Sequence, residues 1–208
     1  LNYGYSRSDL CALISRDEDE FVRWDASQQL AVQIIHEVEL AIQQDLPVSI
    51  DPIILEAWRS LLKDFTLDPA IVAAMVRLPN EVYLGELASQ KAGINVDSIR
   101  KARELVRRYL AQELEEEWLF TYEKFRLHQA YEASGTQIAY RSLSNLALEF
   151  LACQGESGIE LATVQLAESD NMTDRLSALR VLAFEGNESK REQTLDSFYQ
   201  TWKNETLV

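Results

Sequence analysis

The sequence predicts an all-α fold, with about ten helices stacked as antiparallel pairs in the manner of an α-solenoid. Apolar residues recur at steps of three and four along nearly all of the 208 residues, which is the period of an amphipathic helix. The chain has only seven Gly and four Pro, fewer than the turns of a sheet protein would need. Successive apolar stripes follow one another across short turns, which favours stacked helix pairs. No fixed-period repeat is evident, so a regular repeat array is not predicted.

The first residues follow a different pattern from the rest. Leu1–Tyr5 alternates apolar and polar side chains, which is typical of a strand. Because a lone strand is not stable, we expect this stub to belong to a sheet outside the chain. The helical pattern begins near Ser8 and predicts a short helix over Asp9–Arg16. A second helix starts at the acidic run Asp17–Glu20, whose carboxylates suit a helix N-terminus, and ends near Asp45. Its predicted stripe comprises Phe21, Trp24, Gln28, Ala31, Ile34, Ile35, Val38 and Ile42.

Proline and asparagine mark the starts of the next helices. Pro52 and Pro69 each follow an aspartate and stand at a predicted first helical position, where a missing N–H costs nothing. Asn80 is predicted to cap a further short helix. From Asp97 the apolar stripe continues so far that it predicts a single helix to about Ala130. The stripe positions of that helix are Ile99, Ala102, Val106, Leu110, Leu114, Trp118, Tyr122 and Phe125.

The pattern in the last part of the chain predicts four more helices. Apolar spacing indicates helices over Thr136–Cys153, Ile159–Ala167 and Glu188–Trp202. Before the last of these, a further helix is predicted to begin with a capping box. In that box Asn171 caps the first turn and the carboxylate of Asp174 reaches back to it.

Charge and composition exclude several classes of partner. The net charge of −14 argues against nucleic acid and against anionic membrane surfaces, since both are bound by clustered Lys and Arg. No apolar run approaches the roughly 18 residues that span a bilayer, and no signal-peptide pattern is present. Cys11 and Cys153 are isolated in apolar surroundings, which predicts reduced core thiols and a cytoplasmic location.

No complete catalytic or metal site is visible in the sequence. His36-Glu37 begins like His-Glu-x-x-His, in which two histidines on one helix face hold zinc, but position 40 is Leu. The other histidine, His128, has no ligand pattern around it. The basic cluster Arg100–Arg108 is followed by four glutamates and is interpreted as a solvated face, with a partner surface as the alternative. We therefore predict no catalytic, cofactor-binding or metal-ligating residue in this chain.

Several short segments, taken in order, resemble one protein family. The segments are Phe21-Val-Arg23-Trp24-Asp-Ala26-Ser-Gln28, Leu78-Pro-Asn-Glu81 with Tyr83-Leu84, Ala102-Arg103, Arg141-Ser-Leu143-Ser-Asn145, and Asn171-Met172-Thr173-Asp174 with Ala178-Leu179. In this order they resemble the C-terminal helical region of bacterial aminopeptidase N, the alanyl aminopeptidase of the zinc gluzincin class, and the resemblance runs from about Ser8 to Trp202.

The resemblance implies a zinc-dependent parent enzyme that removes N-terminal residues from peptides. Residues 1–7 would be the end of a small β domain, and residues 8–208 would form the C-terminal helical domain, truncated at its C-terminal end. The family's zinc ligands and catalytic residues lie upstream of this region. The resemblance therefore assigns zinc to the intact parent and no cofactor to this chain.

On the same resemblance, the chain covers the catalytic cleft of the intact enzyme. Its implied partners are the catalytic and β domains of its own parent chain and the parent's peptide substrates, with no nucleic acid and no membrane. Trp24, Arg141, Asn145, Asn171 and Asp174 are expected to be structural, packing or capping helix ends. The alternative is a free-standing α-solenoid scaffold that binds other proteins.

Overall fold

The computed structural model describes residues 4–89 and 94–206, and this part of the chain is helical throughout. It contains eleven α-helices, one short 3-10 turn and no strand among these residues. The prediction of an all-α fold is confirmed. The chain divides into two compact units, Leu1–Glu117 (unit 1) and Trp118–Val208 (unit 2), and each is described by itself.

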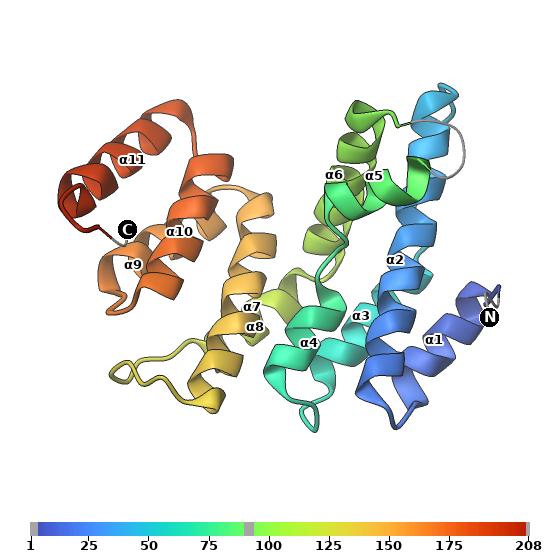
Figure 1. Cartoon of the computed structure of the whole chain (residues 1–208), viewed down its shortest axis with the longest axis horizontal. Helices are drawn as coiled ribbons and strands as arrows, with labels where there is room; N and C mark the ends of the chain where they lie inside the picture. Colours follow the sequence, from blue (N-terminus) through green and yellow to red (C-terminus); the bar gives the residue numbers. More distant parts are fainter. Residues whose placement is uncertain (1–3, 90–93, 207–208) are drawn as a thin grey trace. The chain divides into compact units, whose positions relative to one another are not determined.

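Figure 1 labels the helices in chain order. Unit 1 contains α1 (Arg7–Arg16), α2 (Glu20–Gln43), α3 (Ile53–Lys63), α4 (Pro69–Val76), α5 (Glu81–Ser89) and α6 (Val96–Glu113). Helix α7 (Glu115–Phe125) begins at the end of unit 1 and continues into unit 2. The rest of unit 2 consists of α8 (Gly135–Leu151), the 3-10 turn η1 (Ala152–Gln154), α9 (Glu156–Glu168), α10 (Met172–Glu185) and α11 (Glu188–Trp202).

The strand predicted at the N-terminus is only partly within the described residues. Leu1–Tyr3 lie outside them, and Gly4 and Tyr5 form neither helix nor strand. Helix α1 then begins at Arg7, where Ser6 and Asp9 form a complete capping box. The start of α1 is therefore fixed by side-chain chemistry two residues before the apolar pattern indicated it.

Helix α2 is the central element of unit 1, where it packs against α1, α4 and α6. Trp58 on α3 is fully buried, and its indole N–H donates to the carbonyl of Val76 at the end of α4 over 2.8 Å. Because this donor is satisfied, the ring can fill the core without leaving an unpaired polar group. The buried α2 residues are Arg23, Ala26, Ser27, Leu30, Ala31, Ile34, Ile35, Val38 and Glu39.

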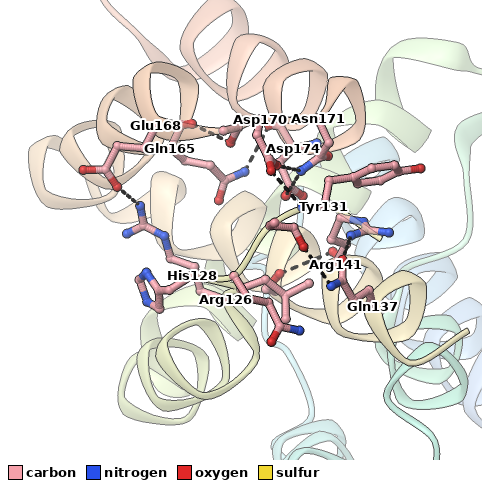
Figure 2. A pocket seen from close by; sticks show the side chains of 15 residues that line it. Arg126, His128, Tyr131, Gln137, Arg141, Gln165, Glu168, Asp170, Asn171 and Asp174 are labelled. Carbon is pink, nitrogen blue, oxygen red and sulfur yellow. Dashed lines mark hydrogen bonds and ion pairs between the residues drawn. The ribbon is translucent and has the colours of Figure 1, made fainter. Parts of the chain in front are cut away.

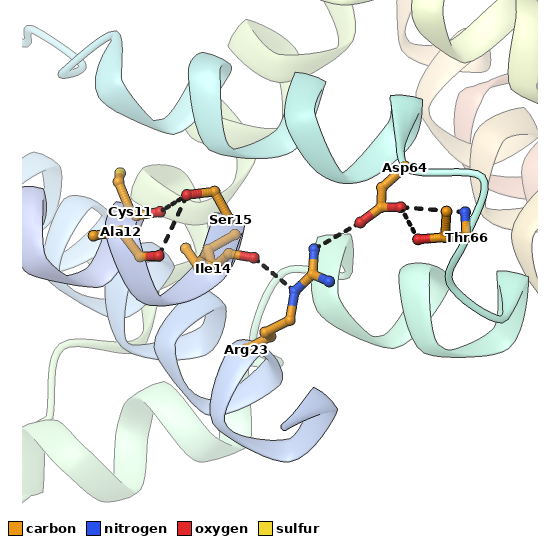
Figure 3. Close-up of polar contacts among 7 residues, drawn as sticks. All are labelled: Cys11, Ala12, Ile14, Ser15, Arg23, Asp64 and Thr66. Atoms are coloured by element: carbon orange, nitrogen blue, oxygen red, sulfur yellow. Dashed lines mark hydrogen bonds and ion pairs between the residues drawn. The ribbon is translucent and has the colours of Figure 1, made fainter. Parts of the chain in front are cut away.

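The predicted apolar stripe of α2 is wrong in its first two turns. Phe21 is 68% exposed and Trp24 is 37% exposed, with their ring centroids 5.6 Å apart. The buried face instead starts at Arg23, whose Nε donates to the carbonyl of Ile14 at 2.7 Å and whose Nη2 pairs with Asp64 at 3.0 Å (Figure 3). A guanidinium can be buried when it is paired. The apolar spacing took no account of this, so it placed the buried face of these turns on Phe21 and Trp24 instead of on Arg23.

The predicted first helical position of Pro69 and the predicted cap at Asn80 are confirmed, whereas Pro52 stands one residue before α3, at its N-cap. Asp68 accepts from the backbone N–H of Ala70 at 2.7 Å, with Pro69 at the first helical position of α4. Asn80 accepts from the N–H of Tyr83 at 2.8 Å at the start of α5. These residues satisfy donors that a helix N-terminus otherwise leaves unpaired.

The single long helix predicted from Asp97 to Ala130 is wrong, because the chain breaks into α6 and α7 at Leu114. The backbone of Leu114 leaves the helical region, at φ −121° and ψ 25°. The stripe explains the break: steps of four residues advance about 40° beyond each full turn, so a straight helix would carry the stripe away from the core. After Phe125 the chain is non-helical up to Ser134.

In unit 2, α10 packs against α8, α9 and α11. Trp118 and Phe150 are both buried and stack with centroids 4.1 Å apart and planes 3° from parallel. At the start of α9, Gly158 lies so close to the backbone of Leu151 and Ala152 that a Cβ atom there would overlap them. A glycine is therefore required for α9 to approach the end of α8.

Candidate functional site

Unit 2 contains a polar pocket of about 300 Å³ (Figure 2). One side is formed by the non-helical segment after α7, which includes Arg126 and Tyr131. The other sides are formed by residues of α8, the C-terminal end of α9, and the turn that leads into α10. Three of the five residues expected to be structural, Arg141, Asn171 and Asp174, line this pocket.

Arg141 on α8 is the buried charge of the pocket, with only 4% of its surface exposed. Its Nη1 donates to Oε1 of Gln137 at 2.9 Å, and its Nη2 donates to the carbonyl of Glu132 at 3.3 Å. The ring of Tyr131 lies 4.9 Å from the guanidinium carbon, within the range of a cation–π contact. Arg141 thus fixes the segment that precedes α8 against the helix.

Gln137, one helical turn before Arg141, completes this attachment. Its side-chain amide donates to the carbonyl of Ala130 at 3.1 Å, and its oxygen accepts from the backbone N–H of Glu132 at 2.8 Å. Gln137 is buried, so these bonds are made away from water, where leaving either group unpaired would be costly. The shape of the segment around Tyr131 is therefore set by α8.

A chain of side-chain hydrogen bonds crosses from α8 to α9 and α10. Asn145 donates to Asp174 at 2.7 Å and accepts from the amide of Gln165 at 2.7 Å. The hydroxyl of Tyr122 donates to Gln165 at 3.2 Å, and burial raises the pKa of Tyr122. The side chains of this network are bonded to one another, so the network holds α7, α8, α9 and α10 in one arrangement.

Asn171 caps α10, with its side-chain oxygen accepting from the backbone N–H of Asp174 at 3.0 Å. The Asp174 carboxylate accepts from the side-chain amide of Asn171 at 2.8 Å, where the sequence suggested a bond to the backbone. The two residues are therefore joined twice, and the cap is tied to α8 through Asn145.

Acidic side chains lie on the exposed side of the pocket. Asp170 accepts from the backbone N–H of Tyr131 at 2.8 Å. This bond, a weaker one from Asn171 and the charge of Arg141 lower the pKa of Asp170. Glu168 pairs with Arg126 at 2.7 Å. The pocket therefore presents both signs of charge.

The fifth residue expected to be structural, Trp24, lies in unit 1 and is partly exposed beside Phe21. Sequence reasoning did not single out Gln137, Gln165, Tyr131 or Asp170. Gln137 carried a signal that was available: it stands four residues before Arg141 and so shares its helix face. Its neighbour Ile138 is exposed, although the side chain is apolar.

The two histidines do not make a metal centre. Nδ1 of His36 lies 3.2 Å from the carboxylate of Glu39, while His128 is an exposed member of the pocket lining. Across residues 4–89 and 94–206, no group of three His, Cys, Asp or Glu is placed to hold a metal ion. Zinc needs three or four such side chains around one point, and the described residues do not bring them together.

A family model described as "Domain of unknown function (DUF3458_C) ARM repeats" matches residues 7–208. The chain belongs to this family. Over its whole length this DUF3458_C chain is 31% identical to the aminopeptidase N of Haemophilus influenzae, across 208 aligned residues. It is 32% identical to the aminopeptidase N of Escherichia coli, again over the whole chain.

The chain spans 23% of the length of both of these relatives. The resemblance to the C-terminal helical region of aminopeptidase N is thereby confirmed. The fold is also found in a crystal structure of Legionella pneumophila aminopeptidase A in complex with aspartic acid. That structure matches with a TM-score of 0.82 at 22% identity, over 98% of this chain and 24% of the other. Within the described residues, no helix of this DUF3458_C chain is both long and apolar enough to cross a membrane.

Proposed function

We propose that this chain is the non-catalytic helical part of a zinc-dependent aminopeptidase that removes N-terminal residues from peptides. The observation that carries the proposal is the similarity along the entire chain to two aminopeptidases N, of which it spans 23% each. The donor set of the described residues does not fit zinc. The metal, which would polarise the scissile carbonyl and activate water, therefore belongs elsewhere in the parent.

In the parent enzyme the chain would cover the catalytic cleft. Its partners would be the catalytic and β domains of its own polypeptide, together with the peptides that enter the cleft. A cover of this kind limits entry to extended chains and excludes bulk water from the reacting atoms. Residues 1–7 would end the preceding small β domain, and residues 8–208 would belong to the helical domain.

Within each unit, consecutive helices would form antiparallel pairs. The short turn between α9 and α10 and their extensive packing support this arrangement, as does the ARM-repeat description of the family. A cytoplasmic location is part of the same proposal. It is supported by Cys11 and Cys153, neither of which forms a disulfide.

The test compares the 208-residue chain with the full product of the reading frame that encodes it. Both are assayed with L-alanine p-nitroanilide, with and without a zinc chelator. We expect chelator-sensitive hydrolysis by the full product and none by the chain alone. A full product without peptidase activity, or one no longer than this chain, would contradict the proposal and favour a protein-binding scaffold.

The covering role is tested separately in the full product. The segment equivalent to this chain is removed, and hydrolysis of alanine p-nitroanilide is compared with hydrolysis of a folded protein that has an exposed N-terminal alanine. We expect discrimination against the folded protein to fall while zinc content is retained. Unchanged discrimination at full zinc occupancy would show that the chain does not control access.

A further inference from the structure

Arg141 carries a buried charge that acts on Asp170 from a distance but forms no ion pair among the described residues. Its hydrogen-bond and ring partners are the oxygen of Gln137, the carbonyl of Glu132 and the face of Tyr131, all of them neutral. Among the residues that the structure describes, no carboxylate forms an ion pair with it. Buried charges are usually paired, so this guanidinium is available to an anionic group from outside the chain.

Two carboxylates on the same pocket are held by amide and backbone N–H groups, with no direct contact to a cation among the described residues. Asp170 accepts from the backbone of Tyr131 and the amide of Asn171, while Asp174 accepts from the amides of Asn145 and Asn171. Neither aspartate forms an ion pair within the described residues. Figure 2 shows both carboxylates and the arginine around one pocket, which has a volume of about 300 Å³. A cavity of this size accepts a small molecule.

We propose that this pocket binds the zwitterion of a free amino acid, with its α-carboxylate on Arg141 and its α-ammonium toward Asp170 and Asp174. A guanidinium offers parallel N–H donors that match the two oxygens of a carboxylate. An ammonium offers three donors to the acceptor-only aspartates. An ion of one sign alone would be repelled by part of this lining, which is why a molecule with both charges fits best. The inference does not rest on the proposed peptidase function.

Three probes separate the two charges. L-Alanine carries both, L-alanine amide lacks the carboxylate, and N-acetyl-L-alanine lacks the ammonium. Titration of the 208-residue chain, followed by NMR or calorimetry, should give saturable binding of L-alanine in the millimolar range. Each single-charge analogue should bind about tenfold more weakly, as expected when a charge-assisted contact is lost. Equal binding of N-acetyl-L-alanine, or no saturable binding of L-alanine up to its solubility, overturns the proposal.

Two variants locate the binding. Arg141→Lys keeps the positive charge but removes the planar fork, and it should weaken L-alanine binding about tenfold. Asp170→Asn should weaken it several-fold and should reduce the preference for L-alanine over N-acetyl-L-alanine. The matched controls are Arg180→Gln and Asp196→Asn, which change exposed residues outside the pocket. Both should bind L-alanine as tightly as the unsubstituted 208-residue chain.

Far-UV circular dichroism checks that each variant is folded. If Arg141→Lys loses helicity, Asp170→Asn decides the question, because its side chain is exposed and makes no contact in the core. Unchanged L-alanine affinity in folded Asp170→Asn, together with unchanged preference among the three probes, would place the binding elsewhere and overturn the assignment.

Discussion

Unit 1 and unit 2 each bury an arginine, and the two side chains are stabilised in different ways. Arg23 of unit 1 is 8% exposed and pairs with the carboxylate of Asp64, which a second bond from Thr66 holds in place (Figure 3). Arg141 of unit 2 is 4% exposed and is bound by neutral groups beside an open pocket. The first arrangement is complete without a ligand, whereas the second leaves a charge that a ligand can use. Burial alone therefore does not distinguish a structural arginine from a binding one, and the identity of its partners does.

The largest expected effect is the loss of the complete pair in unit 1. Arg23→Met leaves the carboxylate of Asp64 without its cation and the carbonyl of Ile14 without its donor. We expect a loss of about 3 kcal/mol in the free energy of unfolding, the low end for breaking a buried pair, because Asp64 is partly exposed. Urea denaturation measures this loss. The control Arg16→Met changes an exposed arginine at the end of α1 and should have little effect.

Arg141→Met should cost less than Arg23→Met, about 1.5 kcal/mol, because it leaves the carbonyl of Glu132, and no directly bonded carboxylate, without its donor. The methionine stem can also keep part of the packing against Tyr131. The same urea experiment provides the comparison. Equal losses in the two variants would mean that Arg141 has a charged partner in solution, and the contrast between the units would then fail.

The cap of α10 gives a smaller effect. Asn171→Ala removes the acceptor for the N–H of Asp174 and should lower stability by about 1 kcal/mol. Asn187→Ala, at the equivalent cap of α11, is the matched variant, since Asn187 accepts from Lys190 in the same way but has no bond to an acidic partner. A cost for Asn171→Ala no greater than that for Asn187→Ala would mean that the link to Asp174 adds nothing.

The same contrast explains what the sequence could and could not predict. Apolar spacing was sufficient for the helical class and for most helix positions, Pro69 located the start of α4, and asparagines located the caps at Asn80 and Asn171. The apolar spacing failed to predict the buried face of a helix where a polar side chain is buried. Arg23 and Gln137 occupy core faces because specific acceptors in other elements meet them, and those acceptors are distant in sequence or lie in non-helical backbone. The pocket could not be predicted, because it depends on the segment after Phe125 being non-helical.

The smallest effect concerns acid pH and Asp64. Burial alone would raise the pKa of Asp64, but hydrogen bonds from Thr66 and Arg23 outweigh it and lower this pKa below its ordinary value. A carboxyl group whose pKa is lower in the folded state stabilises the fold above its unfolded pKa, and that stabilisation is lost as pH falls through the folded value. Stability should therefore decline below about pH 4, and Asp64→Asn should decline less steeply. Arg141 forms no ion pair among the described residues and adds only the smallest contribution to the lowered pKa of Asp170, so Arg141→Met should keep nearly the acid slope of the unsubstituted chain. If Asp64→Asn and Arg141→Met change the acid slope of stability equally, then Arg23 and Arg141 are stabilised in the same way, and the contrast between the two units fails.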